Sequence, residues 1–328
     1  MTVMELVTAY IGYRRTLGDK LSTTEWVLKS MAAHIGTDAG MDALSLSSCS
    51  AFLSPADAST VKPIWFVKYS AMKGLFLWAM SRGYMKEVPL PTETPRRPER
   101  ARPYIYSDAE LKKLFDCALT CRTGRKTMHP HTLRYILMLT YMLGLRISET
   151  VELQVDDIDL ESSTVVIRES KHHKSRVVTF NGQVSSVLRA ILVMRDGMPT
   201  QTEDAHVFQT RKGKPVTTSQ VQDAFADIRR EAGVKRTDGA HCQPRIHDLR
   251  HTFAVNRLTT WYKEGKDVQQ LLPVLSTYLG HLHLTYTSIY LSETMERMDE
   301  ANKRFYKYAQ MNEQSRRKTK ISATSDTG

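Results

Sequence analysis

The sequence predicts a mainly α-helical protein of two domains with one small antiparallel β-sheet. Apolar side chains recur at helical spacing over most of the 328 residues. Two runs rich in β-branched residues, 164–169 and 176–180, lie close together and predict a hairpin. Residues 93–103 contain three prolines and four arginines. That composition interrupts the helical pattern and favours an extended, solvated linker between two domains.

Residues 1–92 are expected to form a helical domain. Apolar residues between positions 4 and 11 predict a first helix that ends near Gly18. A second helix should begin with residues 22–24 as its N-cap, and a third should span about 62–82. The aromatic side chains of the third helix fit the core of a small bundle.

The linker carries Arg96, Arg97, Arg100 and Arg102. We interpret it as a basic strap that crosses a phosphate backbone, and the alternative is a plain tether. After it, residues 104–310 form the second predicted domain.

Ser107 is a suitable N-cap for the first helix of that domain. A strongly apolar helix at 131–143 should end at Gly144 in the C′ position. The hairpin follows, and further helices are expected from about residues 184, 219, 248 and 267. Residues 311–328 are predicted to be disordered.

Composition limits the classes of function. The formal net charge of +11 suits a polyanionic partner, whether nucleic acid or an anionic membrane surface. The sequence has no apolar stretch of about 20 residues and no signal-peptide core near its N-terminus. We therefore expect no membrane association and a cytoplasmic location.

The four cysteines are too few for a disulfide framework and fit a reducing compartment. Cys117 and Cys121 lie one helical turn apart, with His129 and His131 downstream. A zinc site there is the alternative to two ordinary thiols on a helix face, and we favour the thiols.

Two arginines in distinctive local contexts indicate phosphate chemistry. Arg146 follows a helix-ending glycine, and Arg250 lies one helical turn after His247. Guanidinium groups match phosphate geometry and stay charged, so they can stabilise the extra negative charge of a phosphoryl-transfer transition state. A tyrosine, such as Tyr290 or its rival Tyr286 one helical turn earlier, could serve as the nucleophile of such a reaction once its proton is removed.

Four local phrases contain these residues. Arg146 lies in Gly-Leu-Arg-Ile-Ser-Glu, which ends at Glu149, and His247 and Arg250 lie in His-Asp-Leu-Arg-His-Thr-Phe. His281 ends Leu-Gly-His, and Tyr290 follows nine residues later in Ile-Tyr. Together the phrases resemble the tyrosine recombinase (phage integrase) family, over roughly residues 104–300 and more loosely over the first hundred.

The resemblance implies a role for each residue. Tyr290 would be the nucleophile, and Lys171, in the hairpin turn, would protonate the departing 5′ oxygen. Lys174 and Arg176 would be alternatives to Lys171 or phosphate contacts. His247 would shuttle a proton, His281 would hydrogen-bond the phosphate and Glu149 would orient the site.

The resemblance also implies partners and a shape. A SAM-like core-binding domain and the catalytic domain would form a C-shaped clamp on double-stranded DNA that carries a specific recombination site. Neither metal nor other cofactor is expected. The protein would act as a tetramer through a Holliday junction, with the amphipathic helix at 292–309 exchanged between protomers, and would come from a mobile element or integrase system.

Three other functions stay open from the sequence. Asp156, Asp157 and Asp159 could belong to a metal-dependent transposase or nuclease, although we interpret them as a solvated turn. A type IB topoisomerase would use the same tyrosine chemistry, and a degenerate relative would only bind DNA.

A segment around residues 259–265 lengthens the connection from Arg250 to His281 relative to compact members of the family.

Overall fold

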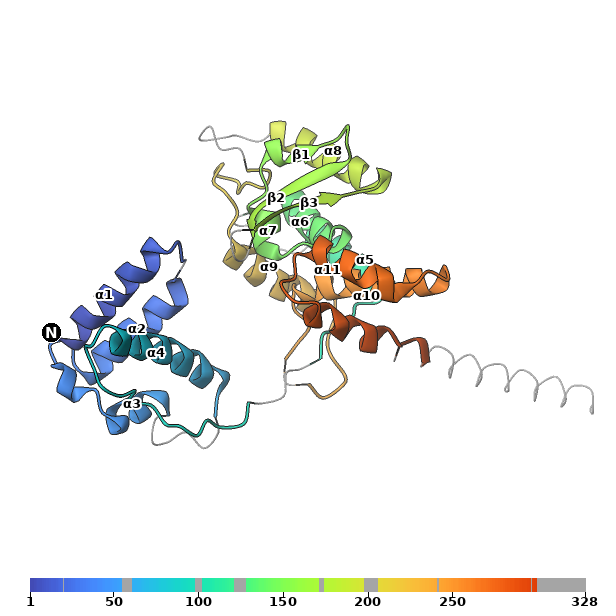
Figure 1. Ribbon diagram of the computed structural model, residues 1–328. Coiled ribbons are helices and arrows are strands. Elements are labelled where there is room, and N and C mark those ends of the chain that lie inside the picture. Colours follow the sequence, from blue (N-terminus) through green and yellow to red (C-terminus); the bar gives the residue numbers. More distant parts are fainter. Residues whose placement is uncertain are drawn as a thin grey trace, which may run out of the picture. The chain divides into compact units, whose positions relative to one another are not determined.

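The computed structural model describes residues 1–19, 21–54, 61–97, 102–120, 128–170, 174–197, 206–240, 242–295 and 297–299. At residues 169, 170 and 174 it describes the backbone alone. The chain divides into two compact units, Met1–Arg100 and Ala101–Gly328, and the division lies inside the proline- and arginine-rich segment (Figure 1).

The first unit is a bundle of helices. Its elements are α1 (Val3–Thr16), α2 (Ser22–Ile35), the 3-10 turn η1 (Met41–Ala43), α3 (Leu46–Leu53) and α4 (Pro63–Ser81). The three predicted helices are present, and α3 and η1 were not predicted. The prediction that residues 22–24 cap α2 was wrong, because α2 begins after Leu21 without a side-chain cap.

The second unit contains the small sheet and most of the helices. Its helices are α5 (Asp108–Thr120), α6 (Pro130–Met142), α7 (Ile147–Val151), α8 (Gly182–Asp196), α9 (Thr218–Glu231), α10 (Asp248–Lys263) and α11 (Val268–Leu279). Residues 285–295 are also helical. Ser107 caps α5 as predicted, because its hydroxyl accepts a hydrogen bond from the backbone N–H of Glu110 at 3.3 Å.

The sheet is antiparallel, in the order β1 (Ile158–Asp159), β2 (Thr164–Ser170) and β3 (Lys174–Thr179). A short 3-10 turn, η3 (Val155–Asp157), leads into it. In the predicted hairpin Val165 pairs with Val178, and both side chains are buried. One face of the sheet therefore joins the apolar core.

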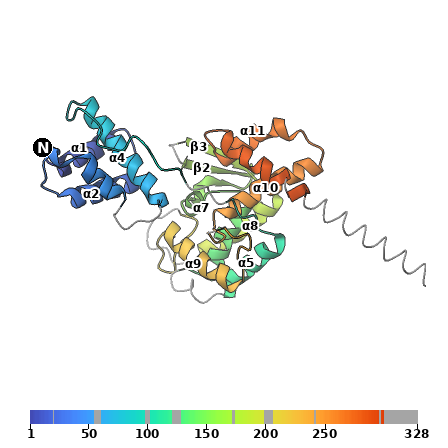
Figure 2. The same cartoon turned by 90° about the horizontal axis from the view of Figure 1, so that it is seen from below.

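The core of the second unit forms around α6. Its apolar stripe is fully buried, and the helix packs against α5, α7, α8 and α10. The strand β2 contacts α7, and β3 contacts α11. Figure 2 shows both strands close to α10. Hydrogen bonds join the start of α7, the start of α10, the end of α11 and strand β3 on one side of this core.

Residues 259–263 form the end of α10, and Gly265 follows them at φ +67°. The lengthened segment is therefore mostly extra helix. Among the described residues, no helix is long and apolar enough to cross a membrane.

Candidate active site

Arg146 is placed by the turn between α6 and α7. Gly144 has φ +60°, and a Cβ atom there would collide with the ring of Phe253, so the tight turn needs glycine. Arg146 follows as the N-cap of α7, and its backbone N–H donates to Glu149 at 2.9 Å. Its side chain donates to Glu149 at 2.6 Å and to the carbonyl of Gly280 at 2.9 Å.

Glu149 is a buried carboxylate surrounded by guanidinium groups. Arg176 donates from Nη1 to Oε1 at 2.9 Å and from Nη2 to Oε2 at 2.8 Å. Arg250 Nη1 lies 3.8 Å from Oε2. Burial alone would raise the pKa of Glu149, but the hydrogen bonds and charges of its arginine neighbours lower it to about 2. The carboxylate is therefore ionised at neutral pH and holds the arginines in place.

Arg250 is buried on the first turn of α10, with 1% of its surface exposed. It donates to the carbonyl of Gly144 at 2.9 Å and to that of Leu279 at 2.5 Å. Burial, and then the nearby charge of Arg146, lower its pKa to about 10, so it remains charged at neutral pH. The two sequence-predicted arginines thus meet, joined by Glu149 and by backbone groups before α7 and after α11.

Tyr290 lies in the helical segment 285–295, is 2% exposed, and belongs to this cluster. Its Oη lies 2.9 Å from Nδ1 of His251. The rival Tyr286 is 52% exposed. Burial raises the pKa of the Tyr290 phenol, while the charge and hydrogen bond of Arg250 oppose that rise. The cationic site therefore favours the phenolate relative to burial alone.

Three histidines lie around the phenol. The ring of His281 is 6.1 Å from that of Tyr290, and its Nδ1 is 2.8 Å from Thr287 Oγ1. His247 meets His251 edge to face at 4.7 Å. Burial, assisted by nearby cations, lowers the pKa of His247 to about 4 and those of His251 and His281 to about 3. All three are therefore neutral at pH 7 in the free protein.

Arg176 has a different environment from the one expected. Rather than facing outward as a phosphate contact, it is 10% exposed in its side chain, and it donates from Nε to the carbonyl of Tyr278 at 2.8 Å as well as to Glu149. Lys171 and the side chain of Lys174 lie outside the described residues.

The linker arginines are only partly described. Arg97 lies over the ring of Phe66 at 5.0 Å, in the first unit. The carbonyl of Arg102 accepts from Arg236 at 2.9 Å. Arg96 is exposed, and Arg100 lies outside the described residues.

The acidic cluster differs from the prediction at one position. Asp157 is buried rather than solvated, because it forms an ion pair with Arg168 and accepts from the backbone N–H of Gln154. Asp159 accepts from two backbone N–H groups of the following turn. Within the described part of the chain, no group of three acidic, cysteine or histidine residues could hold a metal ion. Cys121, from the zinc alternative, lies outside that part.

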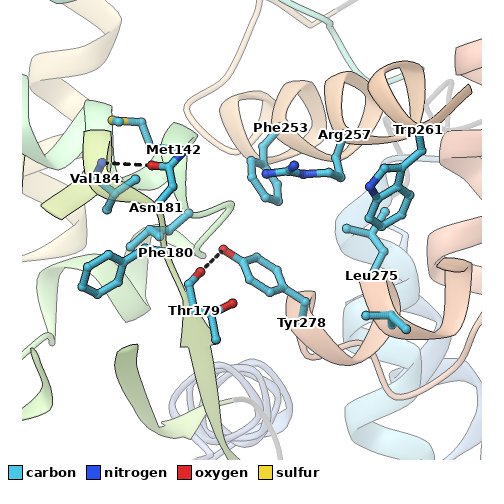
Figure 3. A pocket seen from close by; sticks show the side chains of 12 residues that line it. Met142, Thr179, Phe180, Asn181, Val184, Phe253, Arg257, Trp261, Leu275 and Tyr278 are labelled. Atoms are coloured by element: carbon cyan, nitrogen blue, oxygen red, sulfur yellow. Dashed lines mark hydrogen bonds between the residues drawn. The ribbon is translucent and has the colours of Figure 1, made fainter. Parts of the chain in front are cut away.

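A pocket of about 320 Å³ lies between α10, α11, the end of β3 and the end of α6 (Figure 3). Phe253, Arg257 and Trp261 line it from α10, and Tyr278 closes it from α11, with its hydroxyl donating to the carbonyl of Thr179 at 3.4 Å. No pattern in the sequence indicated this pocket.

Sequence reasoning assigned no role to one residue of the cluster, His251, and did not predict one of the cluster's ion pairs. His251 directly follows Arg250 and lies four residues after His247, so helical spacing could have indicated it. The pairing of Arg176 with Glu149 joins two elements through the fold, and no local pattern indicates it.

The sequence matches the model of the phage integrase family over residues 107–297. It is 32% identical over 307 residues to a putative integrase/recombinase, y4rB, of Sinorhizobium fredii, a match that covers 92% of this chain and 96% of that protein. Tyrosine recombinase XerC of Bacillus pumilus is 29% identical over 232 residues, which cover 68% of each chain.

Two solved structures with a similar fold are bound to DNA. The Tn1549 transposon integrase in complex with transposon right end DNA has a TM-score of 0.65 at 14% identity, covering 92% of this chain and 99% of that one. A lambda integrase tetramer bound to a Holliday junction has a TM-score of 0.63 at 16% identity, covering 88% and 77%.

Proposed function

Because this chain belongs to the phage integrase family, and is therefore an enzyme of the tyrosine recombinase type, we propose that it recombines DNA at a specific site through a covalent 3′-phosphotyrosyl intermediate on Tyr290. One observation carries the proposal. The fold brings Tyr290 together with Arg146 and Arg250, from segments about 145 residues apart, in a buried cationic site.

In the proposed reaction, Tyr290 Oη attacks the scissile phosphorus and the bond from phosphorus to the 5′ oxygen breaks. Arg146 and Arg250 stabilise the negative charge that grows on the non-bridging oxygens, while Glu149 keeps both guanidinium groups in place. His281 adds a hydrogen bond to the phosphate, and His247 carries protons between the site and solvent. By resemblance to the family, Lys171 gives the departing 5′ oxygen its proton.

The proposed nucleophile cannot react in this buried position. Only 2% of Tyr290 is exposed, so a DNA phosphate could not reach its oxygen. We propose that DNA binding moves neighbouring side chains and uncovers the phenol without separating its oxygen from His251, which would restrict cleavage to bound protein.

The proposed substrate is double-stranded DNA held in a C-shaped clamp. The net charge of +11 and the arginines of the 93–103 segment support binding to many phosphates. The proposed boundaries are a SAM-like core-binding domain at 1–92, the linker at 93–103, a catalytic domain at 104–310 and a C-terminal tail at 311–328. The similarity to a putative integrase/recombinase supports an origin in a mobile element, and we propose that the protein acts at the nucleoid.

The proposed active assembly is a homotetramer with the 292–309 helix exchanged between protomers. Lambda integrase, which shares the fold, forms a tetramer on a Holliday junction. In this chain Thr294 is buried in its own unit, whereas the adjacent Met295 is 59% exposed. The pocket between α10 and α11, with Val274 exposed at its edge, offers a binding site for the apolar side chains that follow Met295 in a neighbouring protomer.

The test begins with a duplex that the protein selects from a random-sequence library, rebuilt as a nicked suicide substrate. We expect wild type to form a covalent protein–DNA adduct in the presence of EDTA. Tyr290→Phe should bind the duplex and form none, and the matched control Tyr286→Phe should form it. Adduct formation by Tyr290→Phe would overturn the assignment. Inhibition by EDTA would favour a metal-dependent nuclease, and relaxation of supercoils without strand exchange would favour a topoisomerase.

A further inference from the structure

The phenol of Tyr290 contacts a histidine to which the proposed function assigns no role. His251 Nδ1 lies 2.9 Å from Tyr290 Oη, and the two rings are 5.5 Å apart. A heavy-atom separation of 2.9 Å is within hydrogen-bond reach for proton transfer. The contact therefore joins a titratable group directly to the atom that would attack the phosphate.

The fold fixes the position of His251. It lies four residues after His247, the N-cap of α10, so both imidazoles project from one side of the helix. His251 is half-buried, which limits the orientations its ring can take. The hydrogen-bonded atom is Nδ1, the nitrogen nearer the backbone, and helix packing therefore controls its direction.

The surroundings keep the imidazole neutral in the free protein. Burial is the main cause that lowers its pKa to about 3, and neighbouring cations assist. A neutral imidazole protonated at Nε2 has an unprotonated Nδ1 that accepts a hydrogen bond from the phenol. The titratable and charged groups that face His251 and Tyr290 are Arg146, Arg245, His247, Asp248, Arg250 and His281.

We propose that His251 is a further catalytic residue, which accepts the phenolic proton of Tyr290 through Nδ1 as the phenol attacks the DNA phosphate. The inference rests on the proposed function. The proton moves from Oη to Nδ1, the bond from Oη to phosphorus forms, and the bond to the 5′ oxygen breaks as that oxygen takes a proton from the general acid of the proposed function. During rejoining, the 5′ hydroxyl gives that proton back to the acid and attacks the phosphorus, the phosphotyrosine bond breaks, and Nδ1 returns its proton to Oη.

Substrate binding would strengthen this base. The cations near His251 oppose its protonation, and a bound phosphate brings negative charge against Arg146 and Arg250. The pKa of His251 should therefore rise when DNA fills the site. The imidazole would become basic only where there is a phosphate to attack.

The test compares His251→Asn with wild type on the same nicked suicide duplex, between about pH 5.5 and 9. Asn Oδ1 can accept the phenolic hydrogen bond, because it lies near the position of Nδ1, but it cannot take a proton. We expect adduct formation at pH 7 to fall by about 10²-fold, a loss of general-base catalysis. The variant's rate should then rise with pH, because hydroxide must remove the proton, while the wild-type rate levels off. His131→Asn, an exposed histidine on α6, is the matched control.

A second variant distinguishes loss of the base from misfolding of the site. His251→Ala leaves space beside Oη, and added imidazole should restore adduct formation, whereas the much weaker base pyrazole should not. Wild-type rates in His251→Asn, or an equal loss at every pH without rescue of His251→Ala, would overturn the role of His251 and leave Tyr290 as nucleophile. If wild type itself forms no adduct, the proposed function fails as well.

Discussion

Glu149 and Arg176 form a buried, two-fold hydrogen-bonded ion pair that ties the last strand of the sheet to the turn carrying Arg146. Arg176 also donates to the carbonyl of Tyr278, near the end of α11. One guanidinium thus connects β3, α7 and the segment before His281.

Arg176→Met should destabilise the second unit strongly. Breaking one partner of a buried pair costs about 3–5 kcal/mol, because the remaining charge stays buried. Arg146 still contacts Glu149, so the lower end of that range is expected. Urea unfolding at pH 7 measures the effect, with the exposed Arg189→Met on α8 as control. A destabilisation below about 1 kcal/mol would mean that Glu149 has other adequate partners.

The Glu149 carboxylate should make the free energy of unfolding depend on pH in the acidic range. Its folded pKa of about 2 is below the ordinary value of about 4.3, so its contribution is present above about pH 4.3 and is lost as pH falls towards 2. This difference of about two pKa units corresponds to about 3 kcal/mol of folding free energy. Glu149→Gln should be less stable at pH 7, and its stability should fall less steeply than that of wild type over about pH 4.5–2.5. Parallel curves for the two proteins would contradict the low pKa.

The arginines of the site should matter to the rate more than to DNA binding. Arg146→Ala should slow adduct formation by about 10²–10³-fold, or about 2.7–4 kcal/mol of barrier, as removal of one oxyanion donor does. Arg146→Lys keeps the charge but loses the forked donors, so it should recover only part of the rate. Single-turnover cleavage of the suicide duplex measures both, with Arg189→Ala as control. Near wild-type rates in Arg146→Ala would place the phosphate elsewhere.

The general architecture was predictable because it depends on local patterns. Helical periodicity, the β-branched runs and Gly144 are all visible within a few residues of sequence, and they predicted most helices and the hairpin. The family phrases likewise identified Arg146, Arg250 and Tyr290, which the fold brings together.

The parts that sequence reasoning missed depend on tertiary contacts. The α3 segment is short and serine-rich, so its helix is stabilised by burial of Cys49, Phe52 and Leu53 rather than by a long apolar stripe. Asp157 is buried and forms an ion pair with Arg168, which lies on β2. Residue spacing within one helix or strand does not reveal contacts between different elements.

The linker prediction concerns how the affinity for DNA depends on salt concentration. Neutralising Arg96, Arg97, Arg100 and Arg102 together should flatten the slope of log affinity against log salt, by roughly 0.9 for each phosphate that the variant no longer neutralises. Fluorescence anisotropy on the selected duplex, between about 50 and 300 mM salt, gives the slope. A variant with four exposed basic residues of the second unit neutralised is the control for net charge. If both variants change the slope equally, the segment acts as a tether.

The last prediction concerns assembly, and the structure refines how the C-terminal segment should be cut. A stop after Leu291 would remove Thr294, which is fully buried and donates to the carbonyl of Tyr290 at 2.7 Å, so it would disturb the nucleophile itself. A stop after Asp299 keeps that anchor and removes most of the predicted exchanged helix. We expect residues 1–299 to melt like wild type, bind a half-site and form the phosphotyrosine adduct, yet lose synapsis and strand exchange. Gel-shift assays on half-sites and two-site duplexes, together with light scattering, separate these steps.

Trp261→Ala and Val274→Ser in the full chain should weaken synapsis in the same way if the pocket receives the helix. Wild-type synapsis by residues 1–299 would show that this helix does not link protomers, whereas a lower melting temperature would show that it packs on its own unit.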